Sequence, residues 1–369
     1  MTVPTWTVLT APVPEDLDSP EAWALTGATG TVYAVEMALW GYPDLSYPPT
    51  YLAAQMRAQE YTAKVLLIAV PEGSTPTADD VAGFVKIDMP RHDNVHLAYL
   101  ELWVRPADAR SGVGSALLAE AERIAAEHER TTVIVWSENA GEPPADAPDV
   151  LAPPTGSGRI AADASSARFA LHHGYTLEQA ERYSVLQLPV DPDDLERLHS
   201  EAAAAAGPDY RLVSWTDRAP DEWVDQFAVL ETRMSTDAPT ADLEIEETTW
   251  DAARIRTSEA QIAASGHGYL LVAAEHVPTG TLAAFTFVKY PPNPEVVLQQ
   301  DTLVLKEHRG RRLGMLVKAD LLRRLREVRS DAARVHTWNA EENAYMLSIN
   351  VALGFTPTGV TGMWQKRLG

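Results

Sequence analysis

The stretch LELWVRPADARSGVG (Leu100–Gly114) returns later in the chain as QDTLVLKEHRGRRLG (Gln300–Gly314). The closing glycines lie 314 − 114 = 200 positions apart. In both copies a β-like run leads into a glycine-containing loop, and the loop opens a segment with the apolar spacing of a helix. An internal repeat of this length indicates one fold that is built twice.

The repeat continues beyond the glycine loop. VIVWSENA (Val133–Ala140) matches ARVHTWNA (Ala333–Ala340) at the same offset of 200. HGY (His173–Tyr175) then matches LGF (Leu353–Phe355), where the offset has fallen to 353 − 173 = 180. The first half therefore carries about 20 extra residues, since 200 − 180 = 20. Residues 141–158, rich in Pro, Gly, Ala and Asp, supply them as an inserted loop.

The order of elements in each half predicts the fold class. A variable helical region precedes two β-like runs, the strand and glycine loop, a helix, a strand, a short helix and a last strand. This alternation predicts a layered α/β (α+β) fold with two tandem domains, each a mixed central sheet flanked by helices. We expect one domain at residues 1–190, a linker helix at 191–209 and a second domain at 210–369.

Composition restricts the classes of function. The 369 residues include 30 Lys and Arg against 52 Asp and Glu, a net charge of −22, and no cysteine. So acidic a surface disfavours nucleic acids and anionic membranes and favours a cationic partner. The ten histidines show no metal-binding spacing, and we expect no metal. Without a long apolar run or signal peptide, we expect a cytoplasmic protein, monomeric or homodimeric.

The loop RGRRLG (Arg309–Gly314) is the strongest candidate for ligand binding. Backbone N–H groups at a helix start point outward, and the helix dipole favours negative charge there. Glycines let the backbone approach a ligand closely, and three arginines in six residues add positive charge. The loop therefore predicts a pyrophosphate cradle. An ordinary tight turn with solvated arginines is the alternative that the motif alone leaves open.

Four features in order carry a family resemblance: the strand DTLVL, the loop RGRRLG, the segment TWNAEENAYMLSIN and the closing LGF. The set resembles the GCN5-related N-acetyltransferase (GNAT) superfamily, and its occurrence twice is similar to the layout of tandem two-domain actinobacterial acetyltransferases of the mycothiol-synthase type. The resemblance extends over most of both halves and is best from Gln299 onward. It implies a GNAT fold in each half and acetyl-CoA as the cofactor.

The resemblance also implies the residues that contact acetyl-CoA, through the loop, the strand before it and the helix that carries an asparagine. In the second half these are Leu303, Val304, Leu305, Arg309, Gly310, Arg311, Arg312, Leu313, Gly314, Met315, Asn339 and Asn343. In the first half they are Val104, Arg110, Gly112, Val113 and Gly114. Arg312 departs from the family pattern, which usually has glycine at that position.

The resemblance places catalysis in the second half. Many family members use a tyrosine as the acid at the position of Asn350, which can hold a water or donate a hydrogen bond but is not an acid near neutral pH. Asp301 on the preceding strand is the candidate base, with a solvent-facing carboxylate as the alternative. The first half has Ala109 at the leading loop position and Ala170 at the tyrosine position. We therefore expect it to be degenerate.

The predicted activity is acetyl-CoA-dependent N-acetyl transfer to a small-molecule amine by direct attack. Asp237, Asp242, Glu244, Glu246 and Glu247 lie in the variable front of the second half. We hypothesise that they attract a protonated amine to an entrance, with a solvated acidic surface as the alternative. Two other functions remain open: an acyl-CoA-binding regulatory protein without turnover, and an O-acyltransferase.

Overall fold

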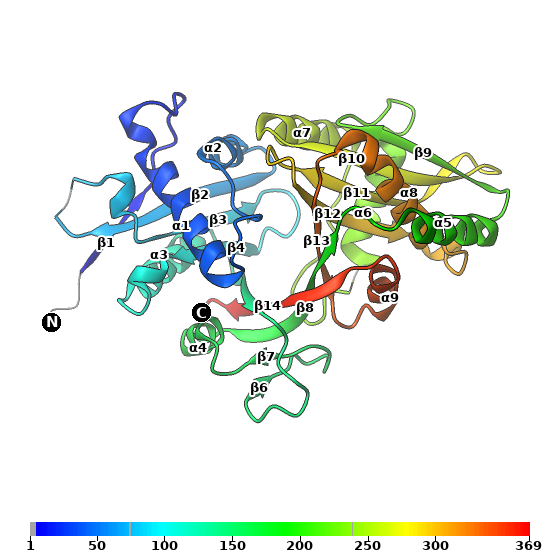
Figure 1. Ribbon diagram of the computed structural model, residues 1–369. Coiled ribbons are helices and arrows are strands. Elements are labelled where there is room, and N and C mark those ends of the chain that lie inside the picture. The colour runs from blue at the N-terminus through cyan, green and yellow to red at the C-terminus, as the bar shows by residue number, and fades with distance from the viewer. Residues whose placement is uncertain (1–4, 74, 238) are drawn as a thin grey trace.

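The computed structural model describes residues 5–73, 75–237 and 239–369, and this part of the chain contains one twelve-stranded sheet with helices on both faces (Figure 1). The strands of the first half are β1 (Trp6–Thr10), β2 (Thr62–Pro71), β3 (Gly83–Pro90), β4 (Leu97–Val104), β5 (Thr132–Ala140), the short pair β6 (Val150–Leu151) and β7 (Ile160–Ala161), and β8 (Thr176–Gln187). Those of the second half are β9 (Tyr210–Thr216), β10 (Gly268–His276), β11 (Thr281–Tyr290), β12 (Val296–Val304), β13 (Arg334–Ala340) and β14 (Thr356–Arg367).

The helices repeat in the same way. In the first half they are α1 (Trp23–Leu39), α2 (Pro49–Arg57), α3 (Val113–Glu127) and α4 (Ser165–His172). α5 (Pro192–Ala206) follows, and the second half contains α6 (Val224–Asp237), α7 (Ala252–Ala264), α8 (Leu313–Val328) and α9 (Ala344–Ala352). The carboxylate of Asp191 caps α5 by accepting from the N–H groups of Asp193 and Asp194. The predicted fold class, two mixed α/β units in tandem, is confirmed.

The two halves exchange their last strands. The sheet order is β1-β2-β3-β4-β5-β14-β8-β13-β12-β11-β10-β9, so the strand that ends the second half pairs with β5 of the first. The strand that ends the first half, β8, pairs with β13 of the second, and β8 and β14 also pair with each other at the centre of Figure 1. Each half therefore needs the other to complete its sheet.

In each half two neighbouring parallel strands pair only at their beginnings. β4 and β5 are in register from Leu97↔Thr132 to Leu100↔Val135, and β12 and β13 only from Val296↔Arg334 to Leu298↔His336. Beyond these pairs the strands diverge. The backbone groups on the diverging edges lose their sheet partners, which leaves a wedge between the strands in each half.

Opposite faces of the first-half sheet pack against different helices. Trp103 and Phe84 lie with α1 and α2 in one apolar cluster. Leu102, Val104 and Val135 lie with α3 in another. Alternation along β4 places these residues on opposite faces. The wedge therefore opens toward α1 on one face and toward α3 and α4 on the other.

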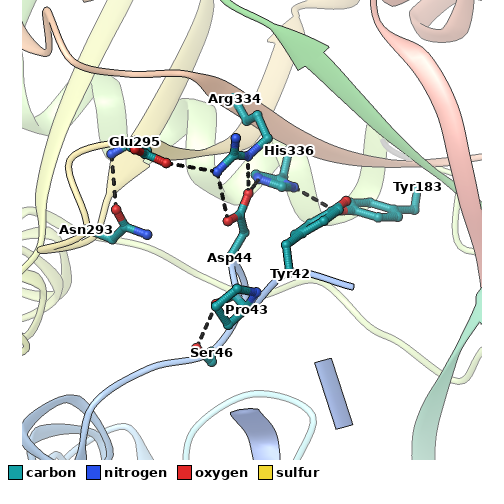
Figure 2. Close-up of polar contacts among 9 residues, drawn as sticks. All are labelled: Tyr42, Pro43, Asp44, Ser46, Tyr183, Asn293, Glu295, Arg334 and His336. Atoms are coloured by element: carbon teal, nitrogen blue, oxygen red, sulfur yellow. Dashed lines mark hydrogen bonds and ion pairs between the residues drawn. The ribbon is translucent and has the colours of Figure 1, made fainter. Parts of the chain in front are cut away.

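A buried ionic network joins the halves beside the exchanged strands (Figure 2). Asp44, which follows α1, accepts hydrogen bonds from Arg334 and from His336 Nε2, the latter at 3.1 Å. The other ring nitrogen of His336 lies 2.7 Å from the hydroxyl of Tyr183 on β8. Burial alone raises the pKa of Asp44, but these hydrogen bonds outweigh it and leave the pKa below its usual value.

Candidate active site

A cavity lies in the first half of the structure. It measures about 1310 Å³ and occupies the wedge between β4 and β5, at the start of α3. Helices α1 and α4 contribute further wall residues. Cavities of this size are suited to cofactors and drug-sized ligands.

The cavity passes through the sheet. Glu101, Trp103 and Glu138 line it on the α1 side, whereas Leu102 and Val104, which alternate with them, line it on the α3 side. Ser137 and Asn139 alternate with Glu138 in the same way along β5. Two ligands entering from opposite faces would therefore meet where the strands part.

The end of the cavity near α3 is suited to an anion. Gly112 precedes α3 in the left-handed conformation (φ 94°), and no side chain caps the helix, so its first N–H groups point outward without a side-chain acceptor. Arg110 and Arg168 line the cavity here, and neither makes a side-chain hydrogen bond or ion pair within the described part of the chain. A guanidinium group just before a helix start, with a second one lining the same cavity, is a pattern expected around phosphates.

The end of the cavity near α1 carries two carboxylates in different environments. Glu101 accepts from Tyr47 Oη at 2.8 Å and Trp103 Nε1 at 3.0 Å, and it pairs with Lys86 at 2.9 Å. Burial alone would raise its pKa, but Lys86 and these donors leave the pKa below normal, so Glu101 is ionised. Glu138 has no ion pair among the described residues, and its Oε2 atom is buried without a hydrogen-bond partner.

This difference gives the two groups different chemistry. Burial raises the pKa of Glu138 to about 7; the nearby Trp40 indole lowers it in part, and the negative charge of Glu101 adds to the increase. A carboxylate with that pKa can accept a proton near neutral pH and release it again. Two nearby carboxyl groups whose environments separate their pKa values are typical of acid–base sites.

A third carboxyl group, that of Glu36 on α1, lies near Glu138. Glu36 on α1 is 1% exposed, and neither of its carboxyl oxygens has a hydrogen-bond partner among the described residues. Burial first, then the nearby Glu138 and Asp44, raise the pKa of Glu36 to about 8. Asp44 has Arg334 and His336 as partners, whereas Glu36 has neither, so Glu36 is protonated at neutral pH.

Comparison with known proteins agrees with this architecture. Residues 31–145, which form most of the cavity's frame, match the family model "Acetyltransferase (GNAT) family". A tandem GNAT protein from the clavulanic acid biosynthesis pathway is similar over 99% of both chains, with a TM-score of 0.73 and 24% identity. The chain is a tandem GNAT-fold protein. The match to the family model falls in the half that the sequence analysis expects to be degenerate.

Two further structures are similar to this chain at lower identity. A GCN5-related N-acetyltransferase from Sphaerobacter thermophilus aligns over 100% of this chain and 98% of its own, with a TM-score of 0.60 and 13% identity. A GCN5-related glucosamine N-acetyltransferase region of a fungal multi-domain GH3 β-N-acetylglucosaminidase aligns over 99% of this chain and 38% of its own, with a TM-score of 0.59 and 13% identity. No curated protein matches the chain.

The glycine loops of the two halves share a backbone conformation with two left-handed residues. The order of arginine and glycine at these two positions is reversed between the loops. In the first loop Arg110 and Gly112 are left-handed, with φ of 65° and 94°. In the second, Gly310 and Arg312 are left-handed at the equivalent positions, with φ of 81° and 56°. Arg312 thus adopts the turn that glycine usually provides, at a modest conformational cost.

The charges of the second loop are already paired within the protein. Arg309 and Lys306 each contact Asp237 at 3.1 Å, and the Asp237 side chain is only 5% exposed. Arg309 also donates to the Val304 carbonyl, on the strand implied to pair with the pantetheine arm. Arg312 pairs with Glu201, and Arg311 lies over the Tyr210 ring. These contacts distinguish the second loop from the first, where the one loop arginine, Arg110, has no side-chain partner among the described residues.

The predicted catalytic residues of the second half lie in separate environments. Asp301 faces Glu231 and Lys289 in a largely buried cluster, where burial raises the pKa values of the two acids and lowers that of the lysine. It is therefore not the solvent-facing carboxylate of the alternative reading. Asn350 donates to Asn339 at 2.6 Å, and its own Oδ1 is buried without a partner.

Other predicted cofactor residues of the second half have structural contacts. Leu313 and Met315 lie in the apolar core, and Leu303 is buried in a neighbouring cluster. Asn343 caps α9 by accepting from the N–H of Met346 at 3.2 Å. A role for any of these residues in cofactor binding stays a prediction.

The acidic segment before α7, residues 237–247, contacts the first half of the chain. The Glu244 carboxylate accepts from Thr132 at 2.6 Å and from Arg367, and Leu243 packs against Leu97 and Ile134. Neither Glu244 nor Asp237 lines the first-half cavity. Both residues are engaged in ion pairs, and the attraction of an amine by this acidic segment stays a prediction.

Glu36, Glu138 and Arg168 are not among the site residues predicted from the sequence. Glu138 lies within VIVWSENA, the segment used to align the repeat, where the second half has Trp338. A carboxylic acid aligned with a tryptophan in an otherwise matching repeat is a sequence signal that could have identified Glu138. In the described part of the chain, no helix is long and apolar enough to cross a membrane, and no group of acids and histidines is arranged to hold a metal.

Proposed function

We propose that the protein is an acyl-CoA-dependent N-acyltransferase for a small-molecule amine and that both substrates bind in the first-half cavity. One observation carries this proposal: among the described residues, a single cavity through the sheet has two arginines without side-chain partners at one end and, at the other, the carboxylate of Glu138, whose buried Oε2 atom has no partner. This choice replaces the sequence-based expectation of catalysis in the second half, where the equivalent loop is neutralised by Asp237 and Glu201.

The residues present fit acyl-CoA. Arg110, Arg168 and the uncapped start of α3 would hold its phosphates, and the unpaired edges of β4 and β5 would hold the pantetheine arm. When bound, the thioester supplies the acyl group that the amine accepts. Val104, Gly112 and Gly114 of the original cofactor prediction also line this cavity.

Glu138 removes a proton from the acceptor amine. An amine enters as an ammonium ion and must lose a proton before its lone pair can attack a carbonyl carbon. The Glu138 carboxylate, with a pKa of about 7, attracts the ammonium and takes that proton. Glu101 stays ionised and paired to Lys86, so it maintains a negative potential at this end of the cavity without competing for the proton.

Calorimetry with acetyl-CoA tests where the cofactor binds. We expect one site per chain, weakened roughly tenfold or more by Arg110→Ala combined with Arg168→Ala, because each loses charge-assisted hydrogen bonds to phosphate. Arg309→Ala is the matched control in the second loop and should leave the affinity unchanged. The opposite ranking would return the cofactor to the second half.

Release of free CoA thiol in the presence of amines tests catalysis. Turnover that depends on an amine supports N-acyl transfer. If acetyl-CoA binds and neither amines nor alcohols accelerate thiol release, the regulatory acyl-CoA-binding function replaces the proposal. Turnover with alcohols alone identifies an O-acyltransferase. Asn350→Ala in the same assay tests the helix position of the second half, and we expect little change.

A further inference from the structure

The wall of the cavity around Glu138 is strongly apolar. On the side that faces α1, it is formed by Val35, Ala38, Leu39, Trp103 and Trp136 together with Glu101 and Glu138. The serines and the asparagine that line the cavity, Ser115, Ser137, Asn139, Ser165 and Ser166, belong to the opposite side or to α4. The acceptor end therefore combines aliphatic and indole surface with carboxylates.

The two tryptophans are placed on either side of the wedge. Trp103 on β4 donates its indole N–H to Glu101 at 3.0 Å and packs against the α1 cluster, which fixes its ring. Trp136 on β5 lies two residues before Glu138, so both side chains point to the same face of the sheet. Its partner across the ladder to β14 is Met363, another apolar residue on that face.

Most hydrogen-bond acceptor positions at the α1 end of the cavity are already occupied by groups of the protein. Glu101 accepts from Tyr47, Trp103 and Lys86, so three of its roughly four acceptor positions are taken. Among the described residues that line this side of the cavity, Glu138 Oε2 is the buried side-chain oxygen without a partner. A ligand with one ammonium group can pair with the Glu138 carboxylate that lines the cavity, but hydroxyl groups elsewhere on the ligand would lose their hydrogen bonds to water without replacement here.

We propose that the acceptor is a primary amine on an aromatic or branched apolar skeleton. Its ammonium group pairs with Glu138, and its skeleton lies against Trp103, Trp136 and the α1 residues Val35 and Leu39. Indole faces next to a cationic group add cation–π attraction to the burial of apolar surface. Amino sugars and linear polyamines are poor fits, because their hydroxyl groups or second charges meet apolar walls. This inference rests on the proposed function for the location of the acceptor.

Direct binding to the protein without acetyl-CoA tests the inference separately from turnover. Phenethylamine, glucosamine and putrescine serve as probes in calorimetry, and we expect phenethylamine to bind at least tenfold more tightly than the other two. Trp136→Ala should weaken phenethylamine roughly tenfold, whereas Trp136→Phe should retain most of the affinity. Trp223→Phe, a partly buried tryptophan outside the cavity, is the matched control and should bind like the unmodified protein.

The outcomes separate the two proposals. Glucosamine or putrescine binding as tightly as phenethylamine, or a Trp136→Ala variant that is folded and binds normally, overturns the acceptor class. Phenethylamine binding that depends on Trp136 while acetyl-CoA fails to bind anywhere overturns the proposed acyl transfer and leaves an aromatic-amine site. Circular dichroism and the melting temperature of each variant identify changes that result from misfolding.

Discussion

Glu36→Gln removes a carboxyl group that is buried in α1 with no hydrogen-bond partner among the described residues. Its pKa is raised from 4.5 to about 8, chiefly by burial and then by Glu138 and Asp44. Tyr183 on β8 and Trp40, which directly follows α1, also lie near Glu36, and neither carries a positive charge. An acid whose pKa is raised on folding stabilises the folded state least at high pH.

The size of the effect follows from the two pKa values. Below pH 4.5 the carboxyl is protonated in both the folded and unfolded states, so it adds no pH dependence. Between 4.5 and 8 the unfolded state loses its proton while the folded state keeps it, which costs about 1.4 kcal/mol of folding stability per pH unit. The penalty is therefore about 1 kcal/mol at pH 5 and about 3 kcal/mol at pH 7. Glutamine cannot ionise, so the substitution abolishes this pH dependence.

Urea unfolding of both proteins at pH 5, 6 and 7 measures the difference. The stability of Glu36→Gln relative to the unmodified protein should improve by about 2 kcal/mol between pH 5 and pH 7, whatever fixed cost the buried amide adds. Glu259→Gln is the control, because Glu259 is also buried (8% exposed, against 1% for Glu36) but accepts hydrogen bonds from Tyr269 and Arg256. A stability difference for Glu36→Gln that does not change with pH would refute the reasoning.

Three further results are expected. Glu138→Gln should lower kcat by about 10²–10⁴-fold and abolish the rise of kcat through pH 7, as a steady-state pH profile will show; a retained rise excludes Glu138 as the base. Residues 1–190 and 191–369, expressed separately, should each fail to fold cooperatively, and mixing them should restore the fold because β8 and β14 are exchanged; a folded single half on calorimetric melting contradicts this. Asp237→Asn should free Arg309 and raise the stoichiometry of acetyl-CoA from one toward two in calorimetry, and a value that remains at one shows that the ion pair does not block the second loop.

The local elements were largely predictable from sequence. The loop ending at Gly314 opens α8 as expected, and the equivalent loop at Gly114 opens α3. Both predictions rest on short-range rules, since apolar spacing and glycine conformation depend on a few neighbouring residues. The offset of 200 between the repeats correctly matched β4 with β12 and β5 with β13.

The site was less predictable, because its function depends on which partners each charge meets. Arg309 belongs to the better family motif, yet it pairs with Asp237, 72 residues away in sequence. Arg110 belongs to the weaker motif and is unpaired within the described part of the chain. Glu138 becomes a candidate base because burial and Glu101 raise its pKa, and neither factor is visible in the motif that contains it.

The sequence alone determined that one α/β fold is built twice, that each copy has a glycine loop at a helix start, and that the first copy carries extra residues at 141–158. These features follow from periodicity and local backbone preference, which are properties of contiguous residues. Only the tertiary structure decided that the final strands exchange. It also decided that the cavity with arginines at one end and carboxylates at the other lies in the first half. Strand pairing, burial and ion pairing join residues far apart in the chain, and their energies depend on distance and desolvation rather than on sequence position.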